Sequence, residues 1–326
     1  MATCQNEESA NVTKALNVLI TGATGDTGGF AVAQLLEKGH RVRALAHRKD
    51  DRSKKLEDLG AEVVVGDFLD FDAVRSAMEG MQRAYFCYPI IPGIIQATAY
   101  FAQAAKEVGV DGIVNMSQIS ARREAKSHSA RNHWLAERVF DWSDVPNVAH
   151  IRPTYFAEWL LYMAPMIKQG VMQVPFSSGR HAPVAAEDQA RVITEILENP
   201  APHSGKIYPL YGPVEMTYEE ISAEISRVIG KPIRFQSVSF DEFWEILGSA
   251  SAYMPIAHVT RSMYGEFERK GQPRTGESYL AQHLRNVSID HTNGVFAGTN
   301  DVIESIGGRP PTTVEAFVRA NRQTFL

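Results

Sequence analysis

A short apolar segment that runs directly into a glycine-rich loop constrains the fold of this chain more than any other feature. The segment Asn17–Ile20 is typical of a β-strand, and a helical pattern of apolar residues follows the loop as far as Gly39. Inside the loop, glycines stand at Gly22, Gly25 and Gly28. Glycines also mark ordinary turns, but strand, loop and helix in this order predict a unit that binds a dinucleotide.

Each glycine of the loop has a physical reason to be there. Gly22 permits a tight turn that a Cβ atom would block, and Gly25 lets backbone N–H groups approach a pyrophosphate at the positive end of the helix. Gly28 lets the helix pack closely on the strand. The loop residues predicted to bind the cofactor are Gly22, Thr24, Gly25, Asp26, Thr27 and Gly28.

The bulk composition is that of a globular chain without a nucleic-acid or membrane partner. Of the 326 residues, 44% are hydrophobic and 22% are charged, which permits a sizeable core. The formal net charge of −5 gives no reason to expect nucleic acid or an acidic membrane as a partner. The two cysteines, Cys4 and Cys87, cannot build a disulfide framework. A cytoplasmic protein is therefore expected, with residues 1–15 as a disordered tail that lacks the features of a signal peptide.

Predicted strands alternate with predicted helices along the first half of the chain. Beyond the first strand, β-strands are expected at 41–46, 61–65, 83–89, 112–117 and 148–153. This alternation is typical of an α/β fold, a Rossmann-type doubly wound parallel sheet. Ligands of such sheets bind at the carboxyl ends of the strands, so the residues that follow the strands should share one rim.

The second half of the chain has a different pattern and predicts a smaller C-terminal substrate lobe. The NAD(P)-binding domain is expected at 16–153 with return segments near 184–211, and the lobe at 154–183 and 212–326. A turn into a short strand is predicted at 179–184, and another short strand at 207–210. The helices predicted here are 189–197 with Asp188 as its cap, 217–229 with a capping box, 240–247, 263–269 and 314–322.

Two residues at the ends of predicted strands bear on the choice of cofactor. Arg48 lies about 20 residues after Gly28, where an enzyme that uses NAD usually has an acidic residue. A guanidinium matches a 2′-phosphate, so NADP(H) is expected in preference to NAD(H), and the alternative is a solvated basic cluster. Asp67 could accept a hydrogen bond from the adenine amino group, or it could be a turn residue.

Four sequence elements in a fixed order resemble the NmrA-like family of atypical short-chain dehydrogenases/reductases. They are the loop at 21–28, Gly-Asp-Phe at 66–68, Arg-Pro-Thr-Tyr-Phe at 152–156, and a tail at 307–318 that begins Gly-Gly-Arg-Pro-Pro. The resemblance covers nearly the whole chain from Leu16. It implies a Rossmann domain with a small substrate lobe that usually binds NADP. The family includes quinone and aryl reductases that deliver hydride, and regulators that bind the dinucleotide and turn over nothing.

The resemblance also indicates which catalytic groups are missing. The wider superfamily uses a serine with Tyr-x-x-x-Lys; Ser117 fits the serine, but the lysine position holds His133 and the tyrosine position holds Ser129. His133 could bond the nicotinamide ribose or act as a general acid, and the alternative is packing beneath the cofactor. Ser117 and His133 are therefore the candidate catalytic residues.

An aromatic group follows the ends of the fourth and sixth strands. Rings beside a cofactor favour a flat apolar ligand, and an anionic substrate would be buried there without a partner. Part of the group, Phe156 and Tyr162 above all, could instead be core between the lobes. The residues predicted to contact substrate are Tyr88, Gln118, Tyr155, Phe156 and Trp159. The cofactor contacts predicted outside the loop are Arg48, Asp67, Phe68, Tyr88, Pro89, His133, Pro153 and Tyr155.

Two functions from different classes fit these observations. The first is an NADPH-dependent reductase that passes hydride to a neutral conjugated acceptor of quinone, enone or aryl carbonyl or imine type. A quinone-like acceptor needs little help from a protein acid, because its reduced oxyanion is delocalised. The alternative is a non-catalytic regulator that senses NADP(H). No metal is expected, because the histidines lack the spacing of metal ligands. A hydrolase is not expected either, because the sequence has no Gly-x-Ser-x-Gly motif. A homodimer is a further hypothesis.

Overall fold

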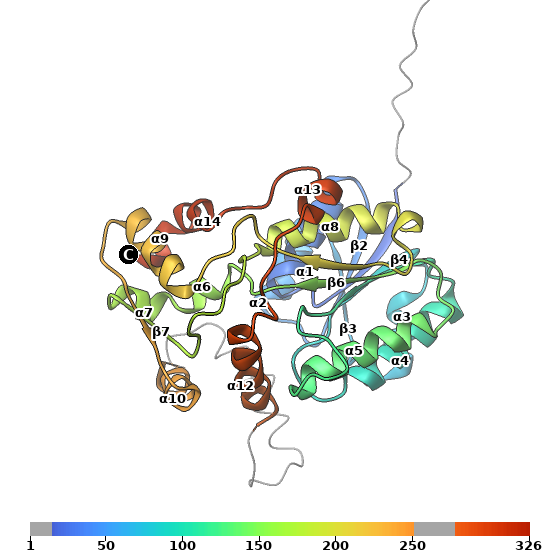
Figure 1. The fold of residues 1–326 in the computed structure, drawn as a ribbon. Helices are drawn as coiled ribbons and strands as arrows, with labels where there is room; N and C mark the ends of the chain where they lie inside the picture. Colours follow the sequence, from blue (N-terminus) through green and yellow to red (C-terminus); the bar gives the residue numbers. More distant parts are fainter. Residues whose placement is uncertain (1–14, 251–277) are drawn as a thin grey trace, which may run out of the picture.

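A seven-stranded parallel sheet forms the centre of the computed structural model, which describes residues 15–250 and 278–326 (Figure 1). The strands are ordered β3-β2-β1-β4-β5-β6-β8, and every neighbouring pair is parallel. The doubly wound Rossmann-type sheet expected from the sequence is therefore confirmed. Its strands are β1 (Asn17–Thr21), β2 (Arg41–Ala46), β3 (Glu62–Val65), β4 (Arg83–Phe86), β5 (Gly112–Met116), β6 (Val148–Pro153) and β8 (Ile207–Leu210).

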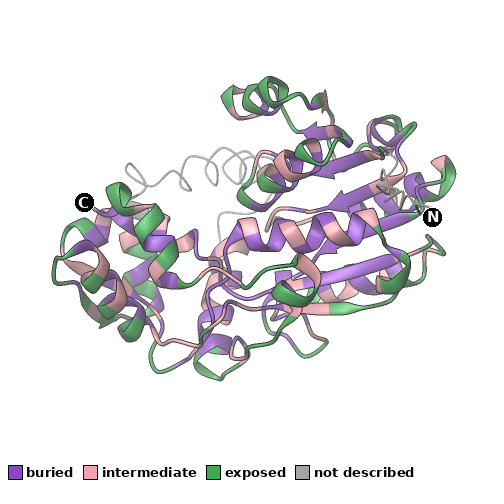
Figure 2. Cartoon of the chain, turned by 90° about the horizontal axis from the view of Figure 1, so that it is seen from above, coloured by how far each residue is buried: buried purple, intermediate pink, exposed green. Residues whose placement is uncertain are grey.

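Helices cover both faces of this sheet and bury its side chains (Figures 1 and 2). On one face, Val32 and Leu35 of α1 and Ile193 of α8 pack on the strands, and on the other Phe101 and Phe140 do so. The helices of the first face are α1 (Asp26–Glu37), α2 (Asp51–Leu59), α8 (Ala186–Glu198) and α13 (Val302–Gly307). Those of the second face are α3 (Phe71–Met78), α4 (Ile94–Val108) and α5 (His128–Asp141).

The C-terminal lobe has its own apolar core and its own small sheet. In this sheet β7 (Val171–Val174) pairs in parallel with β9 (Arg234–Ser237). Buried residues such as Ile167, Ile221 and Val318 form the core. The helices around it are α6 (Trp159–Tyr162), α7 (Ala164–Lys168), α9 (Tyr218–Ile229), α10 (Phe240–Ala250), α14 (Val314–Ala320) and α15 (Arg322–Phe325). A further helix, α12 (Tyr279–Thr292), lies beside α5, and a 3₁₀ turn spans Ala201–His203 (Figure 1).

Helix starts follow the local chemistry in most places. Asp70 caps α3 by accepting a hydrogen bond from the N–H of Ala73, and Thr217 and Glu220 form the capping box predicted for α9. The prediction for α8 was wrong. That helix begins at Ala186 rather than at 189, and its first N–H is bound by the distant Glu158 instead of the adjacent Asp188. The carboxylate of Asp188 is already used by Arg191 and Thr312.

Two further expectations for the second half differ from the structure. Residues 179–184 form only isolated bridges at His181 and Val184, because no neighbouring strand runs alongside them. Residues 302–307, assigned to the lobe, instead form α13 against α8, with Ile303 fully buried in the core of the sheet. The predicted helix at 263–269 and the tail at 1–14 lie outside the described residues.

Candidate dinucleotide site and active-site rim

The glycine-rich loop after β1 has the backbone geometry of a phosphate cradle. Gly22 has φ +61°, and its carbonyl accepts the N–H of Gly25 at 3.0 Å. A Cβ atom on Gly28 would lie 2.3 Å from the Gly22 carbonyl oxygen, so the helix packs on the loop as the glycine pattern predicted. A Cβ on Gly25 would meet only the Gly22 oxygen, at 3.3 Å, and would otherwise enter open space.

The first turn of α1 carries hydrogen-bonding groups suited to an anion. Gly25 is the N-cap and provides no side chain, so no side chain satisfies the first backbone N–H groups of the helix. The hydroxyl of Thr27 is buried and has no partner within the described chain. Free N–H groups at the positive end of a helix bind phosphates. This part of the structure therefore fits the pyrophosphate of a dinucleotide.

Asp26 in the same turn has a partner from the C-terminal lobe. The Tyr162 hydroxyl of α6 donates a hydrogen bond of 2.7 Å to the carboxylate of Asp26. This bond and burial raise the pKa of Tyr162, with burial as the larger cause. Glu158, four residues earlier, accepts the Ala186 N–H with both oxygens, at 3.0 and 3.1 Å. Helix α6 is thus tied to the N-termini of both α1 and α8.

Arg48 lies just beyond β2 at the rim, where the sequence placed it. Its side chain is 49% exposed, and its Nε lies 3.5 Å from the Oδ2 of Asp50. Asp50 itself caps α2, and its bond from Arg52 lowers the pKa of the carboxyl to about 2. Asp67, on the next strand end, accepts the N–H of Leu69 at 2.9 Å and is exposed. That bond is the turn role that the sequence left as an alternative.

The hydroxyl of Ser117, a candidate catalytic group, donates to a buried ion pair. Its Oγ lies 2.5 Å from Oε1 of Glu137, a residue with no exposed surface. Arg152 donates to both oxygens of the same carboxylate, with its Nε at 2.7 Å from Oε1. A buried charge needs this degree of pairing to be stable. The Ser117 hydroxyl hydrogen is therefore used in the bond to Glu137 and is not available to a substrate that accepts hydride.

His133 is buried and neutral, which bears on the two roles suggested for it. Only 5% of the residue is exposed, and burial lowers its pKa to about 4, although Glu137 opposes the shift. A neutral imidazole at pH 7 is a poor general acid, so the structure argues against that role. Its Nδ1 is buried without a partner within the described residues.

Of the aromatic residues predicted to contact substrate, some lie at the rim of the sheet and others lie in the core. Tyr155 is a core residue: it is 7% exposed and stacks on Phe296 with ring centroids 4.5 Å apart. Phe156 bridges to Val184 and packs toward the core of the sheet, as its alternative interpretation held. Trp159 is half-buried with its ring 5.7 Å from that of Tyr155. Phe156 and Trp159 are both half-buried, whereas Tyr155 is buried.

The residues after β4 and β5 do come together. The Tyr88 hydroxyl donates to the Pro92 carbonyl at 3.0 Å, and its ring packs edge-on against Phe68 at 5.4 Å. Gln118 accepts a bond from Ser120 and donates one of 3.4 Å to Ser129, the residue at the tyrosine position of α5. The other rim residues predicted to touch cofactor, Pro89 and Pro153, follow β4 and end β6 respectively.

Sequence reasoning missed Tyr279, the first residue of α12. Its phenol oxygen lies 3.4 Å from the Nδ2 of Asn132 on α5, and it is also hydrogen-bonded to Ser129. Together with Asp67, it contributes to the raised pKa of Tyr88, whose main cause is burial. The helix-capping residue Ser278 directly before Tyr279 was a usable signal for a helix start. Nothing local could have placed that helix beside α5.

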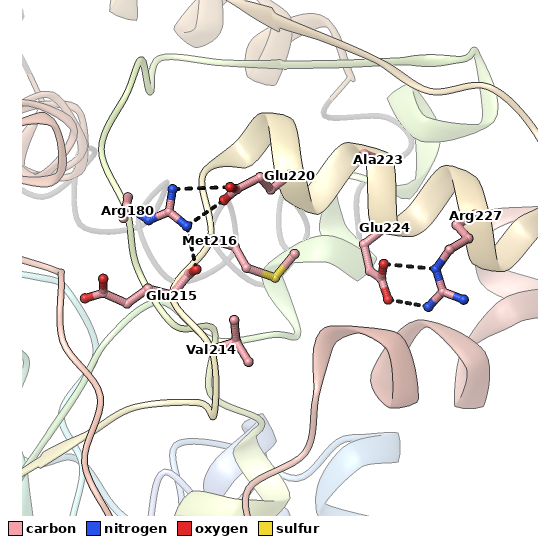
Figure 3. Close-up of a pocket in the computed structure, with 8 residues that line it drawn as sticks. All are labelled: Arg180, Val214, Glu215, Met216, Glu220, Ala223, Glu224 and Arg227. Carbon is pink, nitrogen blue, oxygen red and sulfur yellow. Dashed lines mark hydrogen bonds and ion pairs between the residues drawn. The ribbon is translucent and has the colours of Figure 1, made fainter.

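An open hollow of about 440 Å³ lies elsewhere, on the surface of the lobe (Figure 3). Its charged groups pair with one another: Arg180 binds Glu220, and Arg227 binds Glu224. The residues that line it are Arg180, Val214, Glu215, Met216, Glu220, Ala223, Glu224 and Arg227. None of them is a predicted site residue. Within 15–250 and 278–326, no group of three or more His, Cys, Asp or Glu side chains could hold a metal ion, and no helix is long and apolar enough to cross a membrane.

Comparison with known sequences identifies a family and several relatives. The sequence profile of the NmrA-like family matches residues 14–304. An NAD(P)H azoreductase of Xenophilus azovorans is 24% identical over 310 residues, which cover 94% of this chain and 99% of that protein. Quinone oxidoreductase 2 of Escherichia coli is 26% identical over 288 residues, 83% of this chain and 99% of that protein.

Solved structures agree on the fold. The NADPH-dependent quinone oxidoreductase QOR2 of E. coli, complexed with NADPH, has a TM-score of 0.74 at 23% identity, over 94% of this chain and 99% of that one. NmrA, described as a negative transcriptional regulator and solved with NADP, has a TM-score of 0.70 at 15% identity, over 94% of each chain. Relatives of both functional classes therefore share this architecture.

Proposed function

The chain belongs to the NmrA-like family, and on that premise we propose that it is an NADPH-dependent reductase that passes hydride to a neutral, planar, conjugated acceptor. The observation that carries the proposal is the loop after β1. Its N-cap, Gly25, has no side chain, Gly28 is tightly packed, and the N–H groups of the first turn are open to an anion. Two relatives of this chain are named an NAD(P)H azoreductase and a quinone oxidoreductase.

The proposed cofactor contacts extend from this loop along the rim. The N–H groups around Gly25 hold the pyrophosphate, Arg48 holds the 2′-phosphate of NADP(H), and His133 lies at the nicotinamide ribose. The side chain of Arg48 is half-exposed and can turn toward a phosphate. A bound nicotinamide supplies the hydride, and the protein supplies position and surroundings.

The acceptor class follows from the groups at the rim. Neither of the predicted catalytic residues can easily donate a proton to a substrate, since Ser117 donates its hydrogen to Glu137 and His133 is neutral. Quinones and related conjugated acceptors are reduced without a strong acid because their oxyanions are delocalised. The half-buried Trp159 offers an apolar ring for such a planar molecule. One relative is named an azoreductase, and an azo group between aryl rings is a conjugated acceptor as a quinone is.

Oxidation of NADPH, followed at 340 nm against a panel of quinones, enones, aryl imines and azo dyes, tests this function. We expect turnover with at least one class and none with the Gly25→Val variant, whose side chain would occupy the pyrophosphate space. Carboxylated analogues of the same acceptors are expected to be poorer substrates. If NADPH binds with no turnover across the whole panel, the reductase proposal fails.

That outcome would instead support a second function, a regulator that senses NADP(H). The observation in its favour is the same lack of a ready acid at Ser117 and His133, combined with the shared fold of NmrA. Such a protein would bind the dinucleotide with the same loop and would need no acceptor site. Equal affinities for the oxidised and reduced dinucleotides would count against this function, because a redox sensor must distinguish them.

A further inference from the structure

Helix α12 is fastened to the segment between β5 and α5. Arg122 donates to both carboxylate oxygens of Asp290, at 2.9 and 2.6 Å. The buried hydroxyl of Ser127, the N-cap of α5, lies 2.8 Å from the Nδ1 of His283. Gln282 accepts the N–H of His128 and donates to the Lys126 carbonyl. These contacts fix the first turns of α12 and α5 against one another.

The phenol of Tyr279 reaches the rim from this position. Its oxygen is bonded by Asn132 and Ser129, which belong to the first turns of α5. It is also close enough to Tyr88, at the end of β4, to influence the ionisation of that phenol. The carboxyl ends of β4 and β5 are where a parallel sheet binds its ligand. Tyr279 is therefore a long-range contribution to the proposed acceptor site.

The hydrogen-bond directions leave the Tyr279 hydrogen unused. Ser120 donates to the Oε1 of Gln118 at 2.7 Å, so the amide nitrogen of Gln118 faces Ser129 and donates to it. Ser129 then has its own hydrogen available for Tyr279, and the amide nitrogen of Asn132 can only donate. The phenol oxygen accepts the hydrogen bond of Asn132, and when Ser129 donates to it as well, the O–H of Tyr279 can point to a third group.

Three other hydroxyls around this rim are already engaged, and those of Thr27 and Tyr155, which have no partner among the described residues, are buried. Tyr88 donates to Pro92, Ser117 donates to Glu137, and Tyr162 donates to Asp26. Burial keeps His133 neutral. Tyr279 of α12 is a half-buried phenol beside the ends of β4 and β5, and no acceptor for its hydrogen is assigned among the described residues.

We propose that Tyr279 is the proton donor of this site, giving its phenolic hydrogen to the oxyanion that hydride addition creates on the acceptor. The inference rests on the proposed reductase function. For a carbonyl acceptor, hydride from the reduced nicotinamide forms a C–H bond and the C=O π pair becomes an oxyanion. The O–H bond of Tyr279 breaks, a new O–H bond forms on the product, and water returns a proton to the phenolate. The nicotinamide is oxidised and the carbonyl is reduced by two electrons.

The surroundings of Tyr279 suit this role. Burial raises the pKa of the phenol, so it keeps its hydrogen at neutral pH, while the bonds from Asn132 and Ser129 act in the opposite direction. Those two donors stabilise the phenolate once the hydrogen has left. The donor also widens the acceptor class, because an alkoxide is a far stronger base than a hydroquinone anion and requires an acid.

Two acceptors separate proton donation from a structural role. Tyr279→Phe is assayed with menadione and with 4-nitrobenzaldehyde, and Tyr208→Phe, on β8 and bonded to His203, is the matched control. We expect the variant to lose about a hundredfold in kcat with the aldehyde, with KM little changed, and less than threefold with the quinone. Ser129→Ala should show the same asymmetry to a smaller extent. Equal losses on both acceptors, or a parent protein that reduces menadione but not the aldehyde, would overturn the inference.

A binding measurement decides the question without turnover. In the complex with NADP⁺, 4-nitrophenolate serves as a planar oxyanion, and its absorption band reports hydrogen-bond donation. We expect the parent protein and Tyr208→Phe to bind it about tenfold more tightly than Tyr279→Phe. Equal affinities, or no binding by the parent protein, would refute the role of Tyr279. A protein that shows this difference but oxidises no NADPH would contradict the reductase function and leave the oxyanion contact established.

Discussion

At the scale of single residues, Arg48 carries the expected preference for NADP(H). We predict that Arg48→Ala weakens NADPH binding about tenfold or more, since one charge-assisted hydrogen bond to a phosphate contributes about 1.5–3 kcal/mol. NADH binding should barely change, because NADH has no 2′-phosphate. Lys49→Ala is the matched control, as Lys49 is an adjacent, more exposed cation bound to Glu57. Titration by nucleotide fluorescence measures the affinities of all three proteins for both nucleotides, and equal affinity of the parent protein for NADPH and NADH would contradict the assignment.

Glu158 is the residue whose ionisation most directly concerns neutral pH. Burial raises its pKa to about 7, with Asp26 and Asp188 adding to the shift, while the Ala186 N–H opposes it. A folded-state pKa above the unfolded value means that the folded protein binds the proton more tightly. The resulting stability is fully present below about pH 4.5 and is lost as the pH rises through about 7.

We therefore predict that Glu158→Gln becomes more stable relative to the parent as the pH rises from 5 to 8. The glutamine keeps an oxygen to accept the Ala186 N–H but cannot ionise. Urea unfolding at both pH values measures the difference in unfolding free energy, with the exposed Glu219→Gln as control. A difference between Glu158→Gln and the parent that is the same at pH 5 and pH 8 would show that Glu158 does not titrate in this range.

At the scale of elements, α6 connects the lobe to the phosphate loop. Tyr162 donates to Asp26, and that bond offsets a negative charge beside the proposed pyrophosphate. We predict that Tyr162→Phe weakens NADPH binding several-fold, because it leaves the Asp26 carboxylate unpaired. Asp26→Asn in the same chain should restore the affinity. Isothermal titration of the single and double variants, with Tyr208→Phe as control, measures this; a double variant as weak as the single one would exclude the charge explanation.

The starts of two helices show how far local signals reach. The capping box at Thr217 and Glu220 was readable because its partners are three residues apart. The start of α8 could not be predicted in this way, because its first N–H is bound by Glu158, which lies 28 positions earlier in the chain. An acidic residue near a helix start, such as Asp188, satisfies the same pattern whether it caps the backbone or binds Arg191.

At the scale of the whole molecule, four buried histidines set the response to acid. Burial lowers the pKa of His133 and His291 to about 4, that of His283 to about 3, and that of His181 well below its usual value. A folded-state pKa below the unfolded value gives stability that is present above about pH 6.5 and is lost as the pH falls through the folded pKa. The folded protein therefore resists protonation that the unfolded chain accepts.

We predict that the unfolding free energy falls by several kcal/mol between pH 7 and pH 4, because a tenfold weaker proton affinity in the folded protein corresponds to about 1.4 kcal/mol for each histidine. Urea unfolding across this range measures the slope. His283→Gln should make the slope shallower, whereas His47→Gln, at an exposed position, should leave it unchanged. Stability that does not change between pH 7 and pH 4 would contradict the account.

The sequence by itself determined the sheet and the cofactor loop. Strand alternation, glycine spacing and the Thr217 capping box depend on interactions between residues close in the chain, so periodicity and turn chemistry reveal them. Residues 17–29 therefore predicted a dinucleotide-binding unit, and the order of the motifs along the chain pointed to the family.

Only the tertiary structure decided which side chains meet at the rim. The bond from Tyr162 to Asp26 spans 136 positions, and that from Asn132 to Tyr279 spans 147. Local sequence patterns cannot predict such pairings, because the same residues would form the same helices and strands in any arrangement of these elements. For that reason the sequence predicted Ser117 and Tyr155 as site residues, although Ser117 is bonded to a buried ion pair and Tyr155 lies in the core. Packing of α12 against α5 instead brought Tyr279 to the rim.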